Sequence, residues 1–65
     1  MNNEVYLIGE LINASSEFYH TVAVCATEAA AETWIVRSGG NQMVMLDSGD
    51  IVPEYRISGF IVQEF

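Results

Sequence analysis

The chain has 65 residues, of which 51% are hydrophobic, and a formal net charge of −7 that arises from nine carboxylates against only two cations. This length allows one small domain, and the single cysteine excludes an intramolecular disulfide. The scarcity of cations argues against direct binding to nucleic-acid phosphates or to an anionic membrane surface, because both need Lys and Arg.

The first half of the chain has the composition of a β-hairpin. Residues 4–12 and residues 18–26 are apolar and rich in strand-forming side chains. Residues 13–16, with the sequence Asn-Ala-Ser-Ser, have the composition of a turn. The sequence therefore predicts two antiparallel strands at the start of the fold.

A single helix is expected next, over residues 28–37. Thr27 has the side chain of an N-cap, and Glu28 and Arg37 place charges of the favourable sign in the first and last turns. After Ser38, a glycine can adopt the left-handed conformation that ends a helix. The side chains whose spacing lets them face a sheet are Ala30, Ala31, Trp34 and Ile35.

The last part of the chain predicts two further strands. Residues 43–46 indicate a short third strand, and residues 47–50 have the composition of a turn. Pro53 restricts the segment after it to an edge strand or a loop. Residues 57–65 predict a closing strand, in which Gly59 indicates a bulge or a close approach of the backbone.

These elements predict one α+β domain over residues 1–65, with a small antiparallel sheet and one helix packed on one face. The expected order is β-β-α-β or β-β-α-β-β. One helix can cover only one face of the sheet, and we expect the face with Tyr6, Ile8 and Ile12 to stay uncovered. A homodimer or a partner protein would cover that apolar patch.

Side chains that could support catalysis or metal binding are few. His20 and Cys25 lie five residues apart in one predicted strand, so we expect their side chains on opposite faces and no catalytic dyad. Cys25 has the surroundings of a small buried hydrophobe. Residues 47–50, with Glu54 beyond them, lack the ligand spacing of a calcium-binding EF-hand loop. We therefore predict a protein that is not an enzyme and has no cofactor or metal.

The carboxylates remain as candidate functional groups. Glu28 and Glu32 share one helix face, about 6 Å apart along the axis. The acidic residues are either scattered, solvated positions or a ridge that imitates the phosphates of DNA and docks on a basic protein surface. Spacing alone does not separate these alternatives. The candidate partner-binding residues are Glu28, Glu32, Asp47, Asp50 and Glu54.

A very short, lysine-free acidic chain with this strand–strand–helix–strand order resembles the phage-encoded inhibitors of bacterial defence. Among these it is most similar to the anti-CRISPR proteins, including those that act on type I Cascade complexes. The resemblance rests on size, charge and element order over most of the chain, and on no sequence motif. It implies a viral DNA mimic that binds a basic surface of a CRISPR–Cas effector subunit and blocks target DNA recognition.

Two other functions remain open. The protein could be a small homo-oligomeric interaction module, in which substitution of Tyr6 or Ile8 in the uncovered face would abolish function. It could also be an acidic, antitoxin-like inhibitor of a basic protein. The lone thiol of Cys25 and the absence of a basic export segment at residues 1–4 predict a cytoplasmic location, which for a phage protein is the host cytoplasm.

Overall fold

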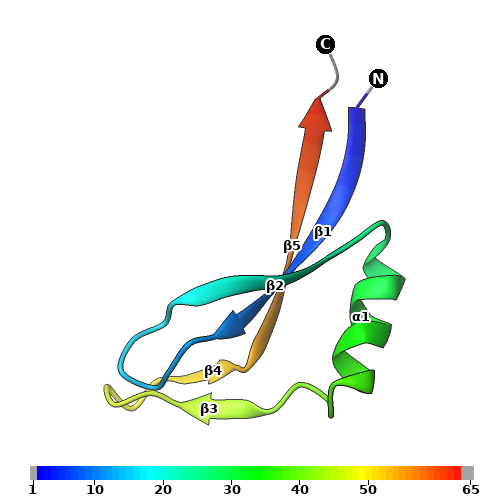
Figure 1. Ribbon diagram of the computed structural model, residues 1–65. Coiled ribbons are helices and arrows are strands. Elements are labelled where there is room, and N and C mark those ends of the chain that lie inside the picture. The colour runs from blue at the N-terminus through cyan, green and yellow to red at the C-terminus, as the bar shows by residue number, and fades with distance from the viewer. Residues whose placement is uncertain (1, 64–65) are drawn as a thin grey trace.

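A computed structural model describes residues 2–63 and has the predicted α+β architecture (Figure 1). It contains one helix, a three-stranded antiparallel sheet and a separate two-stranded sheet. Residues 64–65, at the end of the expected closing strand, lie outside the described residues. In chain order the elements are β1 (Asn2–Leu11), β2 (Tyr19–Cys25), α1 (Glu28–Arg37), β3 (Met43–Met45), β4 (Ile51–Pro53) and β5 (Tyr55–Gln63).

The main sheet has the strand order β2-β1-β5, so the first strand lies at its centre. The predicted β1–β2 hairpin is confirmed, and β2 pairs with β1 from Tyr6 to Leu11. β5 pairs with β1 over nearly its whole length, from Asn2 opposite Gln63 to Glu10 opposite Tyr55. The β1–β5 ribbon therefore projects beyond β2 and α1 (Figure 1), and the longest dimension of the molecule is 43 Å.

The second sheet is the β3–β4 hairpin, closed by a turn in which Leu46 N–H donates to Asp50 O at 2.7 Å. β3 confirms the predicted short strand, whereas β4 was not predicted because it has three residues and ends at Pro53. Two contacts join this hairpin to the rest of the fold. Asp47 N–H donates to Ala14 O at 2.8 Å, and Tyr19 Oη–H donates to Pro53 O at 2.6 Å.

The helix begins and ends where its capping residues predict. Thr27 Oγ1 accepts a hydrogen bond from Ala30 N–H at 3.0 Å, as an N-cap does. At the other end Gly39 has a φ of 109°, and Gly40 N–H donates to Ile35 O at 3.0 Å. Of the four side chains expected to face the sheet, Ala31 and Ile35 are buried and Trp34 is half-buried, whereas Ala30 is exposed.

The helix covers the face of the sheet that we expected to stay free. Ile8 has 0% of its surface exposed and packs against Ala31 and Ile35 of α1, and Tyr6 is half-buried beside it. The expectation that Tyr6 and Ile8 form an uncovered patch is therefore wrong. Ile12 is exposed, but it follows the end of β1 and belongs to the loop before β2.

The small side chains of β2 explain this choice of face. Ala23 lies opposite Ile8 and Cys25 lies opposite Tyr6, so a helix can approach this side closely. On the other side, Leu7 lies opposite the larger Val24. That side of the sheet, which we call the free face, has no helix over it within the described residues. Its apolar side chains are Val5, Leu7, Val24, Phe60 and Val62.

A β-bulge interrupts the β1–β2 pairing between Ile8 and Gly9. β2 has one extra residue at the bulge, which shifts the alternation of its side chains between the two faces by one position. His20 and Cys25 therefore lie opposite β1 residues whose side chains share one face of the sheet. The expectation that their side chains point to opposite faces is wrong for this reason. Five residues of strand still separate them by about 16 Å, which is too far for a dyad.

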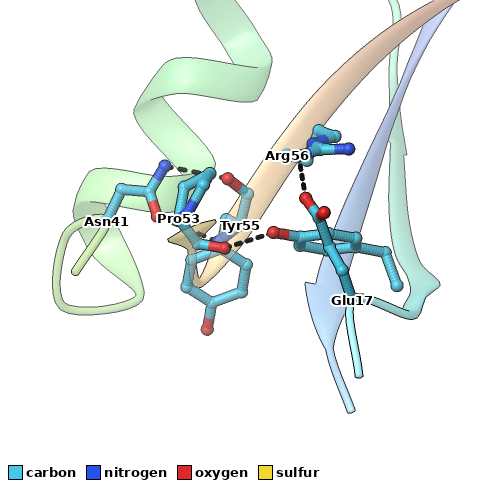
Figure 2. A network of polar contacts seen from close by, with 6 residues as sticks. Glu17, Asn41, Pro53, Tyr55 and Arg56 are labelled. Atoms are coloured by element: carbon cyan, nitrogen blue, oxygen red, sulfur yellow. Dashed lines mark hydrogen bonds and ion pairs between the residues drawn. The ribbon is translucent and has the colours of Figure 1, made fainter. Parts of the chain in front are cut away.

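A group of polar contacts joins β5 to the loops around it (Figure 2). The side chain of Asn41 forms two hydrogen bonds of 2.9 Å with the backbone of Tyr55, one with its N–H and one with its C=O. The ring of Tyr55 is buried and meets Trp34 edge to face, with 5.6 Å between the ring centroids. The segment after the helix is thereby fixed to the start of β5.

Candidate functional site

The five candidate carboxylates occupy two separate regions of the molecule. Glu28 and Glu32 are exposed on the first two turns of α1, whereas Asp47 and Asp50 are exposed in the β3–β4 turn. The helix and this turn lie on opposite sides of the molecule (Figure 1). Glu54 is half-buried in the link between β4 and β5. The fold brings together the two helix residues and the two turn residues, but it does not join them into one cluster.

Three carboxylates outside the candidate set are already engaged within the molecule. Glu4 accepts a hydrogen bond from Tyr6 Oη. Glu10 accepts one from Tyr55 Oη at 3.0 Å, and its other oxygen lies 3.5 Å from His20 Nε2. The third, Glu17, accepts a 2.5 Å hydrogen bond from the guanidinium of Arg56 (Figure 2).

Most of the candidate set has no such partner. Within residues 2–63, the carboxylates of Glu28, Glu32, Asp47 and Glu54 form no side-chain hydrogen bond or ion pair, and Asp50 accepts one bond from Ser48 at 3.1 Å. The structure thus divides the described carboxylates into an engaged group and an available group. Four of the five candidate residues have no side-chain partner among the described residues, and the fifth, Asp50, has only the neighbouring hydroxyl of Ser48.

The two arginines have different surroundings. Arg56 is neutralised by Glu17, and its guanidinium carbon lies 4.6 Å from the centre of the Tyr19 ring. Arg37 is exposed in the last turn of α1, beside a shallow depression lined by Trp34 and its helical neighbours. Sequence reasoning gave this depression no role. Its lining contains two hydroxyl side chains, Thr33 and Ser38, and no carboxylate, histidine or cysteine.

Two tyrosines beside engaged carboxylates have a raised pKa. For Tyr6 the main cause is the hydrogen bond to Glu4, followed by desolvation and by the negative charges of Glu4 and Glu28. For Tyr55 the main cause is the hydrogen bond to Glu10, again with desolvation and nearby carboxylates adding to it. In both cases the neutral phenol is favoured because it donates to the carboxylate.

These shifts predict that the fold becomes less stable in alkali. A tyrosine pKa that is raised in the folded state stabilises the fold fully below the ordinary value of 10.0, and this contribution is lost as the pH rises through the raised pKa. We expect the urea midpoint to fall above about pH 10. The variant Tyr55→Phe should show a smaller fall than wild type. An identical decline in a Tyr6→Phe/Tyr55→Phe double variant would show that these phenols are not the cause.

Other kinds of site find little support in the described part of the chain. Residues 2–63 contain no group of three or more His, Cys, Asp or Glu side chains that could hold a metal ion. The one described helix is too short to cross a bilayer. Cys25 packs against the core but is only half-buried, so it is less enclosed than the buried position expected. Comparison with known protein families, curated proteins and solved structures finds no match for this chain.

Proposed function

We propose that this protein is a non-enzymatic inhibitor that binds a basic, nucleic-acid-binding surface through its unpaired carboxylates. The observation that carries the proposal is the division into engaged and available carboxylates. The available carboxylates have no cation to satisfy them within residues 2–63, and a partner rich in Arg and Lys would supply charge-assisted hydrogen bonds. The net charge of −7 would also speed the encounter with such a partner.

The placement of the carboxylates is compatible with imitation of DNA. Glu28 and Glu32 lie about 6 Å apart along one side of α1, which is close to two of the ~3.4 Å steps at which phosphates of one DNA strand recur along the helix axis. The acidic β3–β4 turn lies on the other side of an elongated molecule of 43 × 24 × 14 Å. A basic channel that encloses the protein would therefore contact both acidic regions.

The proposed partner is a DNA-binding subunit of a CRISPR effector, with type I Cascade as the first candidate. This choice follows the resemblance in size, charge and element order to anti-CRISPR proteins of the DNA-mimic type. In this role the protein would occupy the channel that receives target duplex, and target recognition would fail. The site of action would be the cytoplasm of the infected host.

The proposal can be tested by competition on a native gel. Cascade loaded with labelled target duplex is titrated with this protein across a salt series, and poly-glutamate of matched total charge serves as the control. We expect release of duplex at concentrations where the control is inactive, with an effect that weakens as salt increases. If duplex stays bound at every salt concentration, mimicry of the DNA ligand of that complex is excluded. An acidic inhibitor of another basic protein then becomes the better explanation.

A further inference from the structure

Among the described residues, the free face is the side of the sheet that exposes apolar surface without an unpaired carboxylate. Val24 and Phe60 are 61% and 55% exposed there. Glu4 and Glu10 occupy alternate positions of β1 and belong to the helix-covered face. At the end of the free face, Glu17 and Arg56 neutralise each other.

The chain is extended for its length, so a single copy exposes more surface than a compact monomer would. A typical monomer of 7.2 kDa exposes about 4,100 Å², whereas this chain exposes 4590 Å². The radius of gyration is 13.3 Å, against about 10.7 Å for a compact domain of this length. A value of 13.3 Å is typical of a compact domain of about 115 residues, nearly twice this chain.

The core of a single chain is also small. Among the described residues, Ile8 is the one large side chain that is fully buried. Small domains often supplement a core of this size with disulfides, a metal or oligomerisation. The free face presents an apolar surface on the opposite side of β1 from this core. Packed against another apolar surface, it would form a second hydrophobic core.

We propose that a second copy of this chain covers the free face, so that two three-stranded sheets pack face to face about a two-fold axis. Such an interface is self-complementary, and stacked sheets pack about 10 Å apart through interdigitated apolar side chains. Because the described residues of the face carry no unpaired charge, two copies meet there without bringing any of the described free carboxylates together. A basic partner would instead be attracted to the charged regions elsewhere.

The available area approaches the lower limit of a dimer interface. A strand of 10 residues at ~3.4 Å each and a sheet about 12 Å wide give a footprint of about 400 Å² per copy. Two copies therefore bury about 800 Å² in total if both faces are treated as flat, and the uneven surface of the side chains adds to this area. The flat estimate compares with the ~1,000 Å² expected of a biological interface. The dimer leaves α1 and its carboxylates outside in both copies, so it does not depend on the proposed function.

Two neighbouring residues of β5 provide a matched test. Phe60 lies on the free face, whereas Ile61 is similarly exposed, at 60%, on the other face of the same strand. Sedimentation equilibrium should give twice 7.2 kDa for wild type at micromolar concentration. Phe60→Glu should raise the dimer dissociation constant at least about 30-fold, because a carboxylate would be buried in the interface. Ile61→Glu adds the same charge and should change it less than about threefold.

Several outcomes would overturn the dimer. These are a monomeric wild type at 100 μM, an undisturbed dimer in Phe60→Glu, or equal weakening by both variants. If Phe60→Glu does not fold, the dimer is tested on the wild type alone, by NMR with a soluble paramagnetic probe that broadens the signals of exposed groups. Dimerisation predicts that the methyl groups of Val5 and Val24 become protected from the probe as concentration rises. Unchanged exposure of both residues would exclude the interface.

Discussion

Replacing Ile8 with alanine is expected to lower the free energy of unfolding by about 2–5 kcal/mol, through lost burial and the cavity left behind. Ile8 lies on the central strand β1 and is fully enclosed beneath α1, in a cluster with Ala31, Ile35 and Tyr55. A chain of 65 residues has a total stability of about 3–10 kcal/mol. The variant should therefore be largely unfolded at moderate urea concentrations, as monitored by circular dichroism.

Val36→Ala is the control for this experiment. Val36 is 72% exposed on α1, and alanine favours the helix, so we expect a change within about 0.5 kcal/mol. If both substitutions cost the same, the burial of Ile8 is not what stabilises the fold. A loss in Ile8→Ala alone supports the packing of α1 on this face of the sheet.

The double substitution Glu28→Gln/Glu32→Gln is expected to weaken binding to the proposed partner by about 100-fold at low salt. Each carboxylate would lose a charge-assisted hydrogen bond, whereas glutamine keeps the shape and helix propensity of the side chain. The helix should stay intact, because neither carboxylate has a side-chain partner within residues 2–63. Competition with labelled duplex on the Cascade complex measures the change.

Glu10→Gln/Glu17→Gln provides a control with matched charge. Both double variants raise the net charge from −7 to −5, so long-range attraction to a basic surface falls equally. Glu10 and Glu17 already have partners inside the molecule, in Tyr55 and Arg56. We expect only a few-fold loss for this control. Equal losses in the two variants would remove Glu28 and Glu32 from the interface.

Local signals in the sequence were sufficient to place the helix and the first hairpin. The hydroxyl of Thr27 and the glycines after Ser38 act on neighbouring backbone groups, so their effect can be read without knowing the tertiary fold. The three-residue strand β4 gave no comparable signal. Its pairing with β3 depends on the turn between them rather than on the composition of residues 51–53.

The covered face of the sheet could not be predicted from β1 alone. Val5 and Leu7 are as apolar as Tyr6 and Ile8, so the alternation in β1 gives no preference. The choice depends on which β2 residues lie opposite, and the bulge beside Gly9 alters that register. At Gly9 a Cβ atom would come within 3.0 Å of Tyr19 Cβ, a close approach that the sequence does not reveal.

The candidate site was likewise only partly predictable. The sequence identifies every carboxylate, but it does not reveal which of them find partners in the folded chain. Glu10 and Glu17 are engaged by side chains of β5, 45 and 39 residues away in sequence. The partner of Glu10 follows from the β1–β5 pairing, and that of Glu17 from the position of the loop before β2. Glu28 and Glu32 are left without partners because the helix faces solvent on that side.

The central position of β1 constrains how the molecule can fold as it is made. β1 is the first described strand to be synthesised, yet its second edge is filled only by β5, which comes after every other described element. At ~5–20 residues per second, that edge stays open for a few seconds on the ribosome. Pairing between strands so distant in sequence is also intrinsically slow. During this interval a strand of another nascent chain could pair with the open edge of β1. We therefore expect the yield of native protein to depend on how quickly β5 is synthesised and pairs with β1.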